Sequence, residues 1–390
     1  MLNKTKRIYS IIICCLYIIV CSFSLCYENT LKNVIGNFLF APEDAPDLDV
    51  HFSEISDWHK GTFPYRQTFL DIYGLNMKLF DKRVIGDFSF FRDDYGYIYV
   101  TDPYPECDMP EFVESMNGIQ QNLYDDQVLL YVAYPNRTDF FDYKSSPEVR
   151  ISGDASRAAL DALKGTSIQC MDMEDLFYVN SFGLNRENIN FKTDGHKTTE
   201  TELWIASSVA DVLRSKGICF YDEEDTLDYS SYDVSSYEFL GNSGRNVGRY
   251  YVGTDTFNIY KPRFNTNITL NIPDSDILST GSFEQTVLNG YEDNPHDIYT
   301  YWVTDYGHFG SPCYYYINNL APDNAAKVLF ICDSSAMRAF SYLTLSCKKV
   351  TVLDPRCFGD VPYISNELDS EHYDAVIVIG LDTLMYNAMR

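Results

Sequence analysis

Two short stretches of the chain carry residues that can do nucleophilic chemistry, and the first is built around Ser334. Asp333, Ser334 and Ser335 directly follow the apolar run 328–332 and precede a helix-forming stretch. A side chain at the bend from a strand into a helix lies at the carboxyl edge of a sheet, near the N–H groups that begin the helix. A serine there can be an activated nucleophile with its oxyanion donors in place. The three residues are also good helix N-caps, and this alternative stays open.

The second stretch contains Asp194 and His196 in a loop that enters an amphipathic segment at 200–215. Two residues apart in an extended chain, both side chains point the same way. Asp194 can then hold one imidazole nitrogen of His196 while the other acts as a general base. A turn aspartate beside a surface histidine would give the same pattern. With Ser334, however, the pair meets the requirement for a Ser-His-Asp triad if the fold brings the three together.

Alternating strands and helices must position these residues. Apolar runs predict buried strands at 127–134, 167–171, 328–332, 349–353 and 375–380, and amphipathic stretches predict helices at 67–81, 108–125, 155–164, 173–179 and 200–215. Such alternation is typical of an α/β fold with a mainly parallel sheet covered on both faces. Residues 84–100 predict a hairpin. The Tyr-, Asn- and Gly-rich span at about 225–320 breaks the rhythm and predicts an irregular, partly β insertion.

The N-terminus predicts export. Lys4, Lys6 and Arg7 precede a charge-free apolar run at 8–26, which is long enough to span a bilayer. The basic flank predicts that everything after it is extracytoplasmic. We favour an uncleaved membrane anchor at 1–26 over a cleaved signal, which would give a secreted protein. The acidic, Pro-containing residues at 27–60 predict a stalk. We expect residues 61–390 to form one catalytic domain that includes the insertion.

Charge and cysteine usage exclude several classes of function. The chain has 30 Lys and Arg against 56 Asp and Glu, a net charge of −26, which argues against nucleic acid as a partner. The eleven cysteines show no C-x-x-C pair, so they indicate neither a disulfide framework nor a zinc site, although one or two bridges remain open. The other histidines show no metal-ligand spacing. We therefore expect no metal and no cofactor.

The histidine stretch resembles that of exported SGNH-hydrolase-like proteins of the DHHW and alginate O-acetyltransferase-like family. Its typical form, Y-x-K-T-D-H-H-W, is similar to F-K-T-D-G-H-K-T at 191–198. The family's aspartate and second histidine fall on Asp194 and His196. Gly195 and Lys197 stand where the family has its first histidine and its tryptophan. The triad positions are therefore kept, while the residues around them depart from the family pattern.

Further motifs resemble the family in the same order along the chain. The nucleophile block G-D-S matches 332–334, with Cys332 in place of glycine. F-P-x-R matches 63–66, G-x-x-G-R-x-x-G matches 241–248, and I-D-x-R is similar to 353–356. The resemblance covers the chain from about residue 50 to the end. It implies an SGNH-hydrolase-like, doubly wound sheet in which the motif order is circularly permuted.

The resemblance also implies a function: O-acetyl transfer onto an exported or cell-surface polysaccharide. Ser334 would be the nucleophile, His196 the base and Asp194 its partner. The implied partners are a polysaccharide acceptor, an acetyl donor that a membrane acyltransferase delivers, and the membrane itself. Candidate oxyanion or substrate residues are Ser335, Asn242, Arg245, Tyr306 and, for stacking on a sugar, Trp302. A carbohydrate acetylesterase on the same triad, or an inactive polysaccharide-binding or scaffold protein, are the alternatives.

Overall fold

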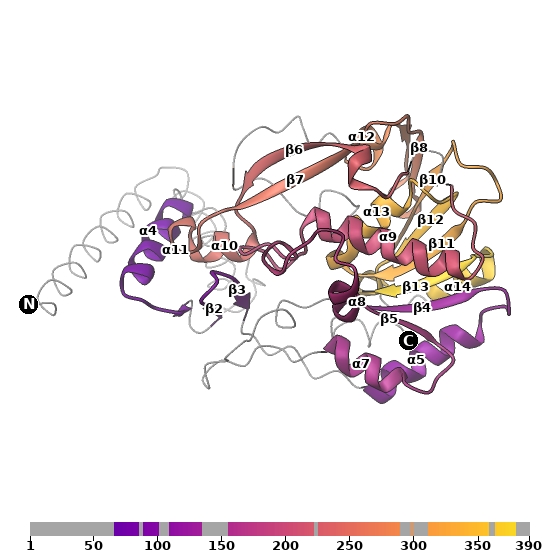
Figure 1. The fold of residues 1–390 in the computed structure, drawn as a ribbon, viewed down its shortest axis with the longest axis horizontal. Coiled ribbons are helices and arrows are strands. Elements are labelled where there is room, and N and C mark those ends of the chain that lie inside the picture. Colours follow the sequence, from indigo (N-terminus) through magenta and orange to yellow (C-terminus); the bar gives the residue numbers. More distant parts are fainter. Residues whose placement is uncertain are drawn as a thin grey trace, which may run out of the picture. The chain divides into compact units, whose positions relative to one another are not determined.

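The computed structural model (Figure 1) describes residues 66–85, 89–100, 109–134, 155–221, 225–288, 298, 311–358 and 363–379. The chain divides into two compact units, Met1–Tyr73 and Gly74–Arg390. Of the first unit, the described part is the start of helix α4 (Arg66–Leu79). The predicted anchor and stalk lie outside the described residues. Within the described ranges, no helix has the length and apolarity needed to cross a membrane.

The apolar runs form the centre of an eight-stranded sheet in the second unit, in the order β5-β4-β13-β11-β12-β10-β8-β9. The first five strands are parallel to one another. They are β5 (Gln169–Asp172), β4 (Val128–Ala133), β13 (Ala375–Ile379), β11 (Lys327–Cys332) and β12 (Lys349–Leu353). The remaining three pair antiparallel: β10 (Cys313–Asn318), β8 (Ile268–Ile272) and β9 (Ile277–Gly281). The predicted α/β fold with a mainly parallel central sheet is thus confirmed.

Helices pack on both faces of this sheet, which explains why its strands are apolar at nearly every position. In β11, Leu329 and Ile331 belong to a buried cluster with residues of α5 (Met109–Gln121), α7 (Ala155–Leu163) and α14 (Tyr363–Ser370). Val328, Phe330 and Cys332 alternate with them and belong to a cluster with α9 (Thr199–Ser215) and α13 (Met337–Leu343). Because successive side chains of a strand point to opposite faces, a strand buried on both sides has no polar face.

Smaller elements complete the second unit. Residues 84–100, predicted as a hairpin, form a three-stranded antiparallel sheet of β1 (Val84–Ile85), β2 (Phe90–Arg92) and β3 (Ile98–Val100). Helix α8 (Met173–Val179) follows β5 as predicted. The short 3-10 turns are η1 (Arg186–Asn188), η2 (Tyr229–Ser231), η3 (Pro273–Ser275), η5 (Ser334–Ala336) and η6 (Pro355–Cys357).

The region predicted as an insertion divides into two parts. Strands β6 (Tyr232–Phe239) and β7 (Asp255–Pro262) form an antiparallel ribbon, joined through α10 (Asn242–Val247) and α11 (Arg249–Val252). Strands β8 to β10, by contrast, extend the central sheet, and α12 (Phe283–Thr286) follows β9. Among the described residues, Cys170, Cys219, Cys313, Cys332 and Cys357 are free thiols.

Candidate active site

Ser334 follows the carboxyl end of β11, a strand with a parallel neighbour on each side, β12 and β13. After Cys332 the chain leaves the sheet, and Ser334 opens the 3-10 turn η5 that leads into α13. Its side chain is half-buried. The carboxyl ends of parallel strands meet at one edge of a sheet, so the turn after β12 shares this edge. The structure therefore places Ser334 at the strand-to-helix bend that the sequence predicted.

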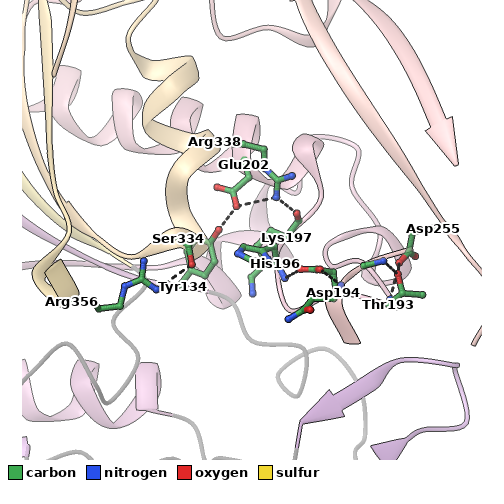
Figure 2. A network of polar contacts seen from close by, with 12 residues as sticks. Tyr134, Thr193, Asp194, His196, Lys197, Glu202, Asp255, Ser334, Arg338 and Arg356 are labelled. Carbon is green, nitrogen blue, oxygen red and sulfur yellow. Dashed lines mark hydrogen bonds and ion pairs between the residues drawn. The ribbon is translucent and has the colours of Figure 1, made fainter. Parts of the chain in front are cut away.

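Arg356, in the turn after β12, contacts the Ser334 hydroxyl (Figure 2). Its Nη1 donates a hydrogen bond to Ser334 Oγ at 3.3 Å. Asp354 holds the guanidinium in a forked pair, with Nε to Oδ1 at 2.9 Å and Nη2 to Oδ2 at 2.6 Å. Burial acts against the charge, but the Asp354 carboxylate outweighs it and raises the pKa of the Arg356 guanidinium. A permanent, oriented cation thus lies beside the candidate nucleophile.

Asp194 and His196 form the pair that the sequence predicted. His196 Nδ1 lies 2.5 Å from Asp194 Oδ1, and the His196 backbone N–H donates to the same oxygen at 3.0 Å. Asp194 is buried, whereas the His196 ring keeps 22% of its side-chain surface exposed. With Nδ1–H directed at the carboxylate, Nε2 carries the lone pair that a general base needs. Among the described residues, the hydrogen-bond partner of Ser334 Oγ is Arg356, not His196.

The Asp194 carboxylate is stabilised in its ionised form. Burial alone raises the pKa of a carboxyl group. Here the hydrogen bond and charge of His196, together with the N–H groups of Asn242 and His196, outweigh burial and hold the pKa of Asp194 well below its usual range. The second carboxylate oxygen, Oδ2, accepts the Asn242 N–H at 2.7 Å. Asp194 is therefore a permanent anion that fixes the imidazole tautomer.

A second aspartate, Asp255 at the start of β7, holds the backbone of the histidine loop. Its Oδ1 accepts from the Lys192 N–H at 3.0 Å, and its Oδ2 accepts from the Thr193 N–H at 2.8 Å and the Thr193 hydroxyl at 2.7 Å. Thr193 in turn accepts from the Gly241 N–H through its hydroxyl at 2.9 Å and from the Gly244 N–H through its carbonyl at 2.8 Å. These hydrogen bonds hold the backbone of residues 192–193 against β7 and α10.

The first two glycines of the G-x-x-G-R-x-x-G motif allow this close approach. A Cβ on Gly241 would lie 2.4 Å from the Asp194 Cβ, and one on Gly244 would lie 2.8 Å from the Thr193 Cβ. Gly241 has φ of −66°, so contact, and not backbone conformation, requires glycine there. A Cβ on Gly195 would meet nothing within 4 Å. The motif therefore shapes a cradle for Asp194, whereas the glycine between Asp194 and His196 has open space around it.

A buried charged network joins the two candidate segments (Figure 2). Arg338 of α13 donates to the Lys197 carbonyl and pairs with Glu202 Oε1 of α9 at 3.9 Å. The Tyr134 hydroxyl, at the end of β4, donates to Glu202 Oε1. Lys197, in the position of the family's tryptophan, holds its Nζ 4.6 Å from the centre of the Tyr134 ring. Arg338 is 1% exposed and Glu202 is fully buried.

The other departures from the family pattern have simple structural readings. Cys332 is buried beneath the turn, and burial raises the pKa of its thiol well above the ordinary value, so it does not compete with Ser334 as a thiolate.

Asn242 and Arg245 lie in α10 on the Asp194 side of the site. Ser335 lies in η5, but its side chain is outside the described residues, as are Trp302 and Tyr306.

No role was predicted from the sequence for five residues that the structure brings to the site. They are Tyr134, Glu202, Asp255, Arg338 and Arg356. For Arg356 a signal was present, since 353–356 resembles a family motif. The others are single residues in strands, helices and turns, and their neighbours come from distant segments. Among the described residues, no cluster of His, Cys, Asp and Glu is suited to hold a metal ion.

The fold is similar to known structures. Bacillus cereus PatB1 with a sulfonyl adduct has a TM-score of 0.56 and 16% identity, over 76% of this chain and 98% of that chain. A DHHW family protein from Eubacterium siraeum has a TM-score of 0.55 and 14% identity, over 76% of this chain and 94% of that chain. No protein-family model matches the sequence, and no curated protein is significantly similar to it. The resemblance to DHHW proteins is thus confirmed at the level of the fold.

Proposed function

From this fold and its Asp194–His196 pair, we propose that the chain is an extracytoplasmic O-acetyltransferase acting on an exported or cell-surface polysaccharide. Ser334 is the nucleophile, His196 the general base and Asp194 its partner. The observation that carries the proposal is the buried, ionised Asp194 on Nδ1 of a partly exposed His196. A surface histidine with no catalytic role does not need such a buried partner. The doubly wound, permuted SGNH arrangement is part of the same proposal.

The reaction follows from the roles of these groups. His196 Nε2 takes the proton of Ser334 as Oγ attacks the acetyl carbonyl of the donor. The backbone N–H groups at the start of the turn, those of Ser334 and Ser335, face the developing oxyanion. Collapse of the tetrahedral intermediate breaks the bond to the leaving group, which takes the proton from the imidazolium. A sugar hydroxyl then gives its proton to His196 and attacks the acetyl-serine, releasing the O-acetylated sugar and free Ser334.

Arg356 has a defined place in this scheme. Its Nη1 donates to Ser334 Oγ, and a cation beside a hydroxyl favours the developing alkoxide. Asp354 orients the guanidinium and is its ion-pair partner, so Ser334 does not have to supply the counter-charge of Arg356. Because Ser334 Oγ is hydrogen-bonded to Arg356 and not to His196, the proton transfer to His196 Nε2 requires the serine hydroxyl to turn from Arg356 toward the imidazole.

The test uses a chromogenic acetyl ester, 4-nitrophenyl acetate, and the full chain with its Ser334→Ala variant. Turnover by the wild type that Ser334→Ala abolishes supports the nucleophile. Because the PatB1 structure carries a sulfonyl adduct, labelling of Ser334 by phenylmethanesulfonyl fluoride, detected by peptide mass spectrometry, is the second readout. No turnover and no labelling by the wild type would leave an inactive polysaccharide-binding or scaffold protein as the better description.

A second experiment separates transfer from hydrolysis. Oligosaccharides added with the ester gain an acetyl group if the chain is a transferase, which product mass detects. Release of acetate alone, with removal of acetyl groups from acetylated oligosaccharides, indicates the acetylesterase. In this proposal the chain lies outside the cytoplasm and is anchored to the membrane by the apolar segment 8–26. A membrane acyltransferase delivers the acetyl group to it. Fractionation and protease accessibility of intact cells test that location.

A further inference from the structure

The buried network described above contains a charge pair that the proposed chemistry does not itself require. Arg338 and Glu202 are 1% and 0% exposed. Ionised side chains are seldom buried so completely unless they are paired, because desolvation is costly and often exceeds the gain of the pair. An apolar pair of similar volume would satisfy packing equally well. The retained charges therefore need a reason beyond stability.

The position of Arg338 in the chain supplies that reason. It lies one helical turn after Ser334, on α13, which continues from the nucleophile turn. Its Nη2 donates to the carbonyl of Lys197, the residue directly after His196. One side chain thus joins the segment of the nucleophile to the backbone of the base. These two segments are separated by about 140 residues along the chain.

Aromatic rings and Glu202 fix the guanidinium at this point. Its carbon lies 5.6 Å from the centre of the Phe191 ring and 5.7 Å from that of Phe257, so the guanidinium packs against both neighbouring rings. Glu202 Oε1 faces it from α9, 3.9 Å away. The Tyr134 hydroxyl fixes Glu202 in turn. Each rotamer in this chain of contacts is therefore defined by the next.

The charges around Glu202 come from every element that packs on it. Burial raises the pKa of its carboxyl group, while Arg338 of α13, the Tyr134 hydroxyl, and Lys197 and His196 of the loop act to lower it. The Glu202 carboxylate thus interacts electrostatically with the base as well as with the guanidinium. A shift of this charge would be felt at both.

We propose that Arg338 is a positioning residue, which with Glu202 as its counter-charge holds the nucleophile helix in register with the backbone of the catalytic histidine. This inference rests on the proposed acyl transfer and deepens it. Misplacement of reacting groups by about 1 Å costs about 100-fold in rate. The pair acts through Ser334 and His196 and touches no substrate. It should therefore affect kcat far more than KM.

The experiment compares Arg338→Met, Arg338→Lys and the double variant Arg338→Met/Glu202→Gln in the full chain, with 4-nitrophenyl acetate as substrate. The double variant removes both charges and leaves no unpaired buried ion, so it stays folded if the single variant does not. We expect kcat to fall about 100-fold in Arg338→Met and in the double variant, with KM within about twofold of wild type. Arg338→Lys, which keeps a charged donor, should recover about tenfold of that loss.

Rates are normalised to the folded fraction, measured by circular dichroism. The control is Lys349→Met, which removes an ion pair with Glu371 at the start of β12, at the opposite end of the strands; its kcat should be unchanged. Folded Arg338→Met and double variants with kcat within threefold of wild type overturn the positioning role. So does an Arg338→Lys no better than Arg338→Met. A wild type without Ser334-dependent turnover overturns the proposed function, and the inference with it.

Discussion

The segment that carries Ser334 and the loop that carries His196 reach the same edge of the sheet by different means. The serine follows β11, a strand buried on both faces, and its turn is the direct continuation of that strand. The histidine loop is anchored in the core by Phe191, but its backbone at Thr193 and the Asp194 carboxylate are held by hydrogen bonds to Asp255 and to α10. The nucleophile is thus placed by packing, and the aspartate that orients the base mainly by polar contacts. The two halves of the site should respond differently to mutation.

The largest expected effect is at the hydrogen-bonded Asp194–His196 pair. Asp194→Asn keeps the size of the side chain but no longer fixes the imidazole tautomer, and we expect kcat/KM for 4-nitrophenyl acetate to fall about 10³- to 10⁴-fold. Asp233→Asn is the matched control, because its carboxylate is 75% exposed in a surface pair with Arg263; it should leave the rate unchanged. A loss of less than tenfold in Asp194→Asn would remove Asp194 from the triad.

The next largest effect is expected in the buried core beneath the segment that carries Ser334. Phe330 is buried in β11 and its ring centre lies 5.9 Å from that of Phe340 in α13. Phe330→Ala should lower the free energy of unfolding by about 3–5 kcal/mol, since it leaves a cavity under the nucleophile turn. Denaturant unfolding measures this loss. Val234→Ala, at a side chain 48% exposed, should cost less than about 0.5 kcal/mol. Equal costs in the two variants would contradict the packing argument.

A pair of glycine variants sharpens the comparison within the histidine side. Gly241→Ala puts a Cβ 2.4 Å from the Asp194 Cβ and should cost about 1–3 kcal/mol in unfolding free energy, with a fall in kcat as the loop shifts. Gly195→Ala places its methyl group in open space and should change neither quantity. Thermal unfolding and ester hydrolysis measure both. If the two variants behave alike, close approach to Asp194 does not decide the loop conformation.

The smallest effect is a difference in pH dependence between two buried carboxylates. The pKa of Asp194 is lowered in the folded state, so its stabilising contribution is present above the unfolded pKa of about 3.9 and is lost as the pH falls below it. The pKa of Glu202 is raised, so its ionisation destabilises the fold as the pH rises through about 4.3 and above.

The stability cost of Asp194→Asn relative to wild type should therefore shrink as the pH is lowered from 7 to 3. The cost of Glu202→Gln should grow over the same range, because the wild type then loses its own buried charge. Urea unfolding at a series of pH values measures the two stability costs. Each cost should change by about 1 kcal/mol per unit of pKa shift that falls within this pH range. Slopes of the same sign for the two variants would contradict the opposite pKa shifts.

The same difference explains how much could be predicted from the sequence. The strands, the helices that follow them and the bend at Ser334 are local patterns, and their bounds agree with the structure within a few residues. The Asp194–His196 contact was also local. The groups that hold this pair in place are Asp255 and the glycines of 241–248, and they are linked to it only through contacts between residues about 50 to 60 positions apart. One-dimensional patterns do not encode such contacts, and neither Glu202 nor Arg338 lies in a recognisable motif.

The division of 225–320 shows the same limit. Its composition predicted an insertion, and the ribbon β6–β7 agrees with that. Strands β8 and β10, however, join the central sheet, where β10 pairs antiparallel with β12. The half-buried alternation in β8 and β10 is typical of strands that are covered on one face. Pairing partners depend on neighbours that are distant in sequence, so the pattern identified strands but not their sheet.

The empty space around Gly195 has a consequence for how this site can be altered. A β-carbon can be introduced between the aspartate and the base without a contact closer than 4 Å. The substitution Gly195→His, which introduces the second imidazole typical of the DHHW pattern, therefore starts from a position where the backbone and its neighbours do not require glycine. The chain offers a natural background in which to measure what that extra ring adds to catalysis.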